Sequence, residues 1–322
     1  PRPRVPRHDR SVTMLSYALR TLVRMALTFF VIVTIVFFAT RLSGNAVDFV
    51  IGEGMTSEDR ELLIKYYELD RPVLSQYLAF LRSFTDGQFG LSFIERRPVA
   101  EIVMERIWPS AQLLLSAVGL TLLVSIPLGI AAAIWRKSWV GSAVMVVAFL
   151  GYAVPNFVLA TLMVLVFSYW LNWLPVVGNG TAWHFIMPTI ALSGVLIAAL
   201  TRFTRNAMLD VLGQDFMRTA RAKGLPENAV IVKHGLRNAG ITILSVIGLQ
   251  VAGLAASGSV VIEAIFAWPG IGDLLVTSAL RRDYPVLQFG VLTVALAVIV
   301  INAAVDLAYA WADPRLRHTV KG

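Results

Sequence analysis

The chain has 322 residues, of which 57% are hydrophobic and 15% are charged, against about 25% charged residues in an ordinary soluble domain. A soluble globule of this length could not bury so much apolar surface, so the composition excludes a stand-alone soluble enzyme and indicates a polytopic membrane protein. Cysteine is absent, which excludes disulfides and thiol chemistry, and the net charge of +8 indicates basic cytoplasmic loops and no nucleic-acid partner.

The membrane-spanning helices are predicted from stretches without Asp, Glu, Lys or Arg, because a helix needs about 20 apolar residues to cross the hydrocarbon core. The longest stretch, 138–201, contains turn residues and interfacial tryptophans at 172–180, so it predicts two helices. The first apolar run, 25–40, also fits a signal peptide, but no Ala-x-Ala site follows it and we interpret it as a retained helix. The six expected helices are 17–41, 109–135, 139–171, 186–203, 238–266 and 285–311.

The distribution of Lys and Arg predicts the orientation of these helices. With the N-terminus inside, the inner segments carry 18 of the 28 basic residues and five acidic residues. The outer segment 41–106 carries eight basic and eleven acidic residues. Because basic residues collect on the cytoplasmic side, we expect both termini in the cytoplasm. The inner segments are 1–24, 136–137, 202–237 and 312–322.

Outside the first helix and the membrane core, the chain is expected to have an outer polar segment and two tails. The predicted organisation is a basic tail 1–16, a first helix 17–41, an extracytoplasmic segment 42–106, a five-helix core 107–311 and a cytoplasmic tail 312–322. In the extracytoplasmic segment, the sequence predicts a helix over 56–69, an amphipathic helix from Pro72, a turn at 86–90 and an amphipathic stretch from Val99 into the membrane. A small cap over the helices and a docking surface for an external partner both fit this composition.

The cytoplasmic loop 204–238 is predicted to form two helices with a break between them. The first helix is expected over 206–223, Gly224-Leu225-Pro226 interrupts it, and the second is expected over 227–238. A solvated loop that only sets topology needs no apolar side chains, but this one carries several, so we favour a protein interface. The apolar residues are Phe216, Met217, Leu225, Ile231, Val232 and Leu236.

The same loop carries a resemblance to a known family. The sequence DFMRTARAKGL at 215–225, followed by KHGLRNA at 233–239, resembles the EAA loop of ABC importer permeases, and more closely that of the B-type permease subunits of dipeptide, oligopeptide and nickel importers. Arg218 stands where the general EAA pattern has an acidic residue, as is common in the peptide-importer subfamily, and Gly224 matches the glycine of the motif. Further similar segments, in the family's order, are 86–92, 126–129, 173–175, 263–272, 281–285 and 313–315.

The resemblance implies a fold, a function and a set of partners. The fold would be an all-α polytopic membrane protein of the type I ABC importer permease class, with six transmembrane helices, cytoplasmic termini and a small helical extracytoplasmic segment between helices 1 and 2. The partners would be a homologous second permease, two ABC ATPase subunits, an extracytoplasmic substrate-binding protein and the lipid bilayer of the bacterial inner membrane. The cargo would be dipeptides or oligopeptides, with glutathione and nickel chelates left open.

The resemblance also implies the site residues. ATP and Mg would be bound by the partner subunits, so this chain would hold no cofactor or metal and would not be an enzyme. The residues expected to couple to the ATPase are Asp215, Phe216, Arg218, Thr219, Ala220, Arg221, Ala222, Lys223, Gly224, Leu225, His234, Leu236 and Arg237. The residues expected to dock the binding protein are Phe89, Gly90, Arg281, Arg282 and Asp283.

Other chemistry has little support in the sequence. There is no Gly-x-x-x-x-Gly-Lys-Ser/Thr phosphate cradle and no His-Glu-x-x-His motif, and the four histidines are dispersed. Glu263 and Asp306 lie near the ends of predicted spans, where interfacial anchoring or an ion pair is the simpler interpretation. The alternative function is an ion-coupled secondary carrier for a small polar solute, which would use one of these two acids.

Overall fold

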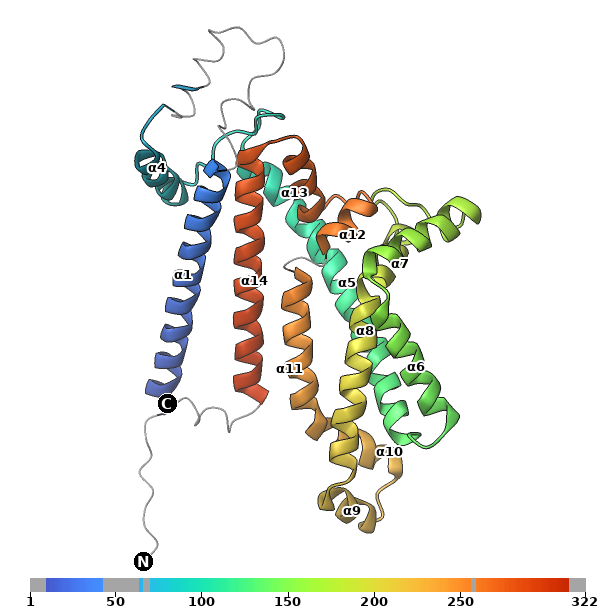
Figure 1. Cartoon of the computed structure of the whole chain (residues 1–322). Helices are drawn as coiled ribbons and strands as arrows, with labels where there is room; N and C mark the ends of the chain where they lie inside the picture. The colour runs from blue at the N-terminus through green and yellow to red at the C-terminus, as the bar shows by residue number, and fades with distance from the viewer. Residues whose placement is uncertain (1–9, 43–63, 66–69, 256–258, 313–322) are drawn as a thin grey trace, which may run out of the picture.

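The computed structural model describes residues 10–42, 64–65, 70–255 and 259–312 (Figure 1). These ranges form helices and connecting turns without a β-strand, apart from an isolated bridge between Leu91 and Pro98. The helix predicted over 56–69 lies outside the described residues except at 64–65. The helix predicted from Pro72 is present as α4 (Val73–Asp86), and it ends at Gly87 in a left-handed turn.

Four helices of the described ranges are long and apolar enough to cross a membrane individually. Two further pairs of helices pass the same test of length and composition only when each bent pair is counted as one span, so the total is four to six. A multi-span helical fold is therefore confirmed, while the predicted number of six depends on the bent pairs. The four single helices are α1 (Arg10–Leu42), α5 (Val99–Ile134), α8 (Ala182–Leu212) and α14 (Tyr284–Ala312).

The third predicted span, 139–171, is wrong as a continuous helix. The chain instead forms α6 (Trp139–Ala153), followed by α7 (Asn156–Met163) and the π-helix η1 (Val164–Trp170), and it bends by 95° between them. Val154 and Pro155 at the bend have extended backbone conformations. Proline has no backbone N–H to donate and disfavours a helical conformation in the preceding residue, so the helix has to end at this point.

Three other predicted boundaries also differ from the structure. The expected helix 206–223 is divided, because α8 ends at Leu212 and α9 (Asp215–Ala222) starts after an extended Gln214. The expected second loop helix does not end at 238 but continues through α10 (Glu227–Ala229) and η2 (Val230–Leu236) into α11 (Arg237–Gly253), with a bend of 53° between 227–240 and 242–253. The fifth predicted span, 238–266, falls on α11 and α12 (Ser259–Ile265), between which 256–258 lie outside the described residues, and α13 (Ile271–Leu280) follows.

The core of the molecule is the pair α5 and α8, which have the most extensive contact of any two elements (Figure 1). Gly129 of α5 permits this contact, because a Cβ at that position would lie 2.5 Å from the Thr204 Cβ of α8. At the other end of α5, Leu113 is fully buried among residues of α8 and α12, together with Met187 and Phe266. Small residues at helix interfaces let backbones approach closely inside a membrane.

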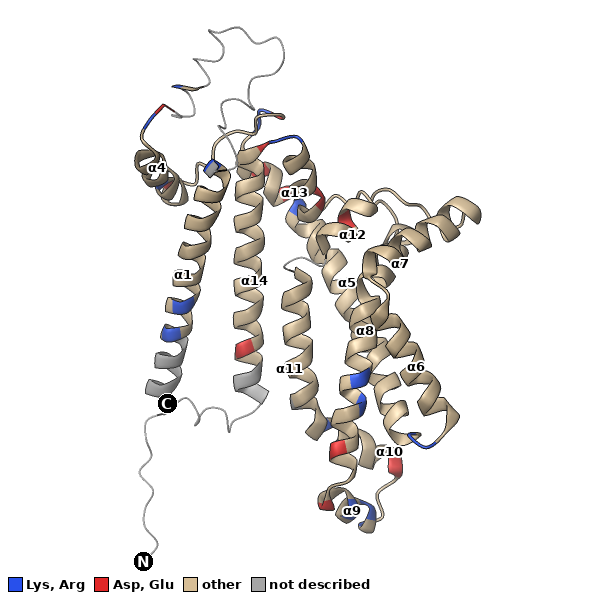
Figure 2. Ribbon diagram, viewed as in Figure 1, with Lys and Arg blue, Asp and Glu red and all other residues tan. Residues whose placement is uncertain are grey.

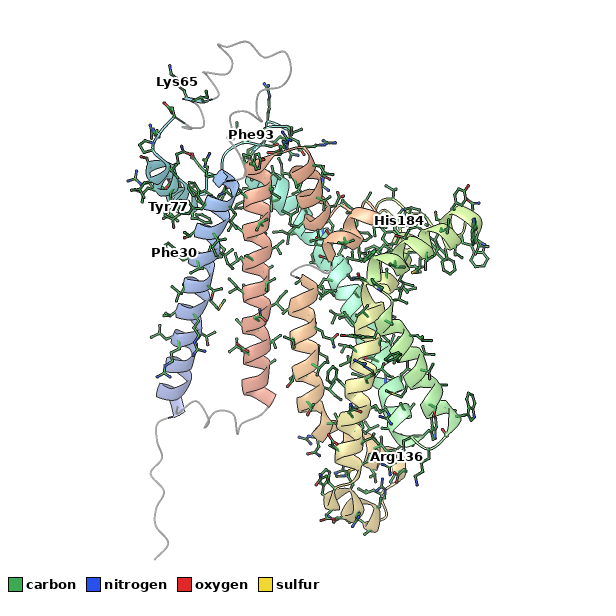
Figure 3. The ribbon with its side chains drawn as sticks, in the orientation of Figure 1. Phe30, Lys65, Tyr77, Phe93, Arg136 and His184 are labelled. Atoms are coloured by element: carbon green, nitrogen blue, oxygen red, sulfur yellow. The ribbon has the colours of Figure 1, made fainter. Side chains whose placement is uncertain are left out.

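The first helix lies at the edge of the molecule. Of the described elements, it packs mainly on α14, and α4 lies beside its Leu42 end (Figure 1). The Tyr77 hydroxyl of α4 and the Thr34 hydroxyl of α1 are 2.7 Å apart, and Figure 3 shows Tyr77 where the two helices meet. From Leu19 onward, most other side chains of α1 are exposed or half-buried, as at Leu27 and Ile35, which suits a helix that faces lipid.

Replacement of Gly129 by alanine tests the close packing of α5 on α8. The added methyl would overlap the Thr204 side chain and the Thr201 carbonyl oxygen, which is 2.9 Å from the Cβ position, so we expect a loss of about 1–3 kcal/mol. The readout is the midpoint of thermal unfolding of the purified full-length chain in detergent. Gly119→Ala in the same helix is the matched control, because a Cβ there meets nothing within 4 Å. Equal midpoints for the two variants would contradict the packing described here.

Candidate functional site

A short helical segment protrudes beyond the ends of α8 and α11 at one end of the molecule. We call residues 213–237, which include α9, α10 and η2, the α9 segment (Figure 1). Lys and Arg gather on this segment and on the adjoining end of α8, as Figure 2 shows. The opposite end of the molecule carries α12 and α13, and we call it the α13 end. The predicted coupling residues thus lie at one end and the predicted docking residues at the other.

The helix α9 has one buried and one exposed face. Met217 and Ala220 are buried and pack on Val230 of η2, with Val211 and Leu212 of α8 beside them. This packing fixes α9 to the end of α8 and to η2, which continues into α11. Because a buried apolar contact resists relative movement of its parts, a force on α9 would be passed to both helices.

The predicted coupling residues divide between these two faces. Ala220 is buried in the contact with η2, so it holds the helix in place, and His234 and Leu236 are half-buried. The others present their side chains or backbone at the surface. The exposed members are Asp215, Phe216, Arg218, Thr219, Arg221, Ala222, Lys223, Gly224, Leu225 and Arg237.

The break between α9 and α10 has a defined geometry. Gly224 has φ of +73°, a left-handed conformation that costs a residue with a Cβ about 1–2 kcal/mol. The Arg221 guanidinium donates to both carboxylate oxygens of Glu227 across the break, at 2.9 Å from Nη2 and 3.1 Å from Nε. This hydrogen-bonded pair lowers the pKa of the Glu227 carboxyl from its ordinary value. The sequence predicts the break at Gly224, but not the ion pair that spans it.

The exposed face combines apolar and basic side chains. Phe216 and Leu225 are about two-fifths exposed, at 40% and 39%, and Val232 is 57% exposed. Arg218 and Lys223 are exposed on the same segment. An apolar centre with a charged rim is typical of a surface that docks another protein. The described residues contain no group of three His, Asp or Glu side chains that could share a metal ion.

The α13 end is held together by a buried carboxylate. Glu263 of α12 is fully buried, and its Oε2 accepts a hydrogen bond from the backbone N–H of Gly272 at 2.7 Å. Its Oε1 accepts from the Ser110 hydroxyl of α5 at 2.8 Å, and the Ser110 oxygen in turn accepts from the Ile271 N–H at 2.8 Å. Both N–H groups belong to the first turn of α13, whose unpaired donors and positive dipole favour an acceptor with negative charge.

Of the two interpretations predicted for Glu263, the ion pair is wrong for the described residues, and interfacial anchoring stays a prediction. Its carboxylate caps α13 and ties α12 and α13 to α5, and within the described ranges it forms no ion pair with a basic side chain. The Trp268 indole N–H strengthens the same attachment by donating to the Pro109 carbonyl oxygen of α5 at 2.9 Å. Asp306, the other acid of the predicted spans, is exposed on α14.

The predicted docking residues gather at the α13 end, but they do not all face outward. Asp283 is buried, where it accepts hydrogen bonds from the Ser92 hydroxyl and, at 3.1 Å, from the Phe93 N–H. The ring of Phe89 packs on Phe289, with 4.1 Å between the ring centroids. These two predicted residues hold the surface in shape. Arg281, Arg282 and Gly90 are exposed, and their role in docking stays a prediction.

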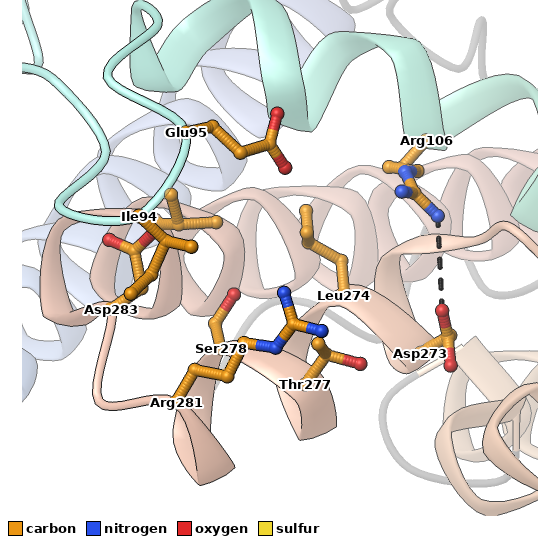
Figure 4. Close-up of a pocket in the computed structure, with 10 residues that line it drawn as sticks. Ile94, Glu95, Arg106, Asp273, Leu274, Thr277, Ser278, Arg281 and Asp283 are labelled. Atoms are coloured by element: carbon orange, nitrogen blue, oxygen red, sulfur yellow. Dashed lines mark ion pairs between the residues drawn. The ribbon is translucent and has the colours of Figure 1, made fainter.

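A cavity of about 210 Å³ opens between α13 and the start of α5 (Figure 4). Its lining carries charges of both signs, including Glu95 and Arg281, and the Arg106 guanidinium lies 3.8 Å from the Asp273 carboxylate. Burial raises the pKa of Asp273 from its ordinary value. A lining of both signs suits a polar partner that carries both charges, such as a protein loop or a peptide.

Substitutions at Glu263 test its capping role. Glu263→Ala would leave the Gly272 N–H and the Ser110 hydroxyl without their buried acceptor, which costs about 1–3 kcal/mol for each unsatisfied group. We expect a clearly lower midpoint of thermal unfolding in detergent. Asp306→Asn, an exposed acid on α14, is the control and should leave the midpoint unchanged. A stable Glu263→Ala protein would show that the carboxylate has a role other than capping α13.

Comparison with known proteins identifies relatives over most of the chain. The family described as “Binding-protein-dependent transport system inner membrane component” matches residues 125–318. The glutathione transport system permease protein GsiC of Escherichia coli strain K12 is 39% identical over 306 residues, which is 95% of this chain and 100% of GsiC. GsiC of Shigella dysenteriae serotype 1 gives the same values.

Among solved structures, an inward-facing form of the MetNI methionine ABC transporter superposes with a TM-score of 0.57. The match covers 66% of this chain and 97% of that chain at 15% sequence identity, so it supports the fold alone. The predicted family and the predicted place in the bacterial inner membrane are confirmed by these findings. The family consists of transporter permeases, which are not enzymes. This chain therefore belongs to the binding-protein-dependent transport system inner membrane components, the permeases of ABC importers.

Proposed function

We propose that the chain is one of two homologous permease subunits of an ATP-driven importer for small peptides, and that its α9 segment docks on a partner ATPase. The observation that carries this proposal is the geometry of the α9 segment. It presents Phe216, Leu225 and basic side chains outward, while Met217 and Ala220 anchor it to the long helices. A surface of this kind both binds a partner and transmits its movement.

Coupling would work by rigid-body movement of the α9 segment. When the two ATPase subunits close on ATP and Mg, they would carry α9 with them. The apolar contact of Met217 with Val230 and the Arg221–Glu227 ion pair would keep the segment from deforming. The movement would pass through α8 and η2 into the membrane core, as in other transitions that rock packed helices as units.

The α13 end would receive an extracytoplasmic substrate-binding protein. It lies at the opposite end of the molecule from the α9 segment (Figure 1). A polar contact surface is offered by the exposed Arg281 and Arg282 together with the adjacent cavity, whose lining carries charges of both signs. The buried Asp283 fixes the turn that presents the two arginines. Because α5 and α8 connect the two ends, release of substrate and hydrolysis of ATP would be linked through one packed unit.

The proposed cargo is a di- or oligopeptide or a related small peptide such as glutathione. The support is the 39% identity to GsiC, which is a glutathione permease by name. The ion-coupled carrier loses its support at Glu263, because both oxygens of Glu263 already bind donors of α5 and α13, and Asp306 is the acid left for it. A group that exchanges protons during transport has to be reachable from the pathway in at least one state.

A reconstituted assembly tests this function. We expect purification through a tag on this chain to yield a second permease and two ATPase subunits. In liposomes that contain ATP, the assembly should take up labelled glutathione or a labelled dipeptide only with the binding protein present. A protonophore should leave the uptake unchanged. Uptake that is driven by a proton gradient without ATP would contradict the proposal and favour a secondary carrier.

Substitution at Gly224 tests the coupling role of the α9 segment. Gly224→Val places a β-branched side chain at φ of +73°, so the break should rearrange at a cost of about 1–2 kcal/mol. We expect the assembly to form and hydrolyse ATP while uptake falls at least severalfold. The control is Gly213→Ala, because Gly213 has an ordinary φ of −80° and room for a Cβ. Normal uptake by the Gly224→Val assembly would refute the assignment.

A further inference from the structure

A second cavity, also of about 210 Å³, lies between α1, α4 and α14. It is lined by Phe37 and Arg41 near the end of α1, by Phe80 of α4, and by Gln288 and Phe289 near the start of α14. The candidate spans run over Leu19–Arg41 in α1 and Tyr284–Ala308 in α14. The cavity is therefore at the level where two membrane spans end, which is the level of lipid headgroups.

The walls of this cavity are aromatic. A chain of ring contacts runs from Phe37 of α1 through Phe80 and Phe84 of α4 to Phe89, and from there to Phe289 of α14. The successive centroid distances are 5.5, 5.4, 5.3 and 4.1 Å. Aromatic contacts of this kind add to the apolar burial and hold the three elements in register. The ring contacts therefore hold the walls of the cavity in place, and its apolar sides suit acyl chains or glycerol carbons.

Arg41 and the Gln288 amide supply hydrogen-bond donors to the cavity, which also carries the Gln76 amide and the Ser83 hydroxyl. The half-buried Arg41 guanidinium lies 5.4 Å from the centroid of the Phe37 ring, and within the described ranges no carboxylate lies within 4.0 Å of it. The Gln288 Nε2 is buried and has no acceptor among the described residues. A buried donor without an acceptor is costly, and a fixed cation favours an anion. Both groups point to a ligand with negatively charged oxygens.

The surroundings of the cavity are those of a lipid-facing surface. Helix α4 exposes Val73, Leu74 and Leu78, which are 49%, 67% and 51% exposed. The adjoining part of α1 exposes Ile35 to 60%. A short helix with an exposed apolar face beside the end of a span is typical of a helix that lies in the membrane interface. A lipid beside it can place its chains on this apolar surface.

We propose that this cavity binds the headgroup of an anionic glycerophospholipid of the outer leaflet. Its phosphate would accept hydrogen bonds from Arg41 and from the Gln288 amide, and its acyl chains would follow the exposed faces of α1 and α4. An anionic headgroup fits better than a choline headgroup, because the described lining supplies a cation and no carboxylate. The lipid would join α1 and α4 to α14, and this role does not depend on the identity of the transported peptide.

Native mass spectrometry of the purified assembly tests this site. After delipidation in mild detergent, the assembly is titrated with phosphatidylglycerol or with phosphatidylcholine. We expect one tightly retained phosphatidylglycerol that phosphatidylcholine does not replace. In the Arg41→Gln assembly, phosphatidylglycerol should bind at least about fivefold more weakly than in the unmodified assembly. Arg24→Gln, an exposed arginine on the same helix, is the control and should keep the lipid. Excess inorganic phosphate should not displace the lipid, since a free anion lacks the chains.

A second variant keeps the test decisive if Arg41→Gln fails to assemble. Ala79 lines the cavity, so Ala79→Trp should fill it and expel the lipid with Arg41 intact. Leu74→Trp, on the exposed face of the same helix, should retain the lipid. The proposal is overturned if Ala79→Trp binds phosphatidylglycerol as well as the unmodified assembly does, or if both lipids are retained equally. Displacement by inorganic phosphate would show an anion site that is not a lipid site.

Discussion

The close packing of α5 against α8 is the constraint on which both ends of the molecule depend. Near one end of α5, Gly129 lets the α8 backbone approach. Near the other end, the Ser110 hydroxyl donates a hydrogen bond to the Glu263 carboxylate and so fixes α12 and α13. The α9 segment extends from the end of α8, and Met217 ties it back to the helices of the core. A bilayer offers no water to satisfy exposed backbone groups, so such a unit is held by close packing and, at the α13 end, by the paired carboxylate of Glu263.

The sequence predicts much of the helical pattern, because the spans are read from apolar runs that local composition determines. It predicts less well where a helix bends or stops inside such a run. Pro155 lies in an uninterrupted apolar stretch, and proline is tolerated in many membrane helices, so its presence does not tell whether the helix kinks or turns by 95°. The end of α8 at Leu212 has an even weaker signal in the sequence. Only Gly213 marks it, before the extended Gln214.

The candidate site shows the same division between local and distant information. The motif around Gly224 identifies the α9 segment, because its residues are adjacent in the sequence. The roles of single residues within it depend on tertiary contacts, as for Ala220, which the motif includes but which lies buried against η2. The capping of α13 could not be predicted, because it joins Glu263 to Ser110, 153 positions earlier in the chain. From the sequence alone, an acid near the end of an apolar run fits interfacial anchoring, an ion pair or a transport role, and only its donors distinguish these.

The bend at Pro155 has a consequence for the membrane itself. A helix of 15 residues, such as α6, rises about 22 Å, whereas the hydrocarbon core is about 30 Å thick. Since α7 and η1 turn away at 95°, their length adds little depth. Exposed aromatic side chains, Tyr169 and Trp170 among them, cluster where this arm ends, as they do at a membrane interface. A bilayer of average thickness would therefore exceed the length of α6 on this side, and a thinner local membrane or an adjoining protein would compensate for the difference.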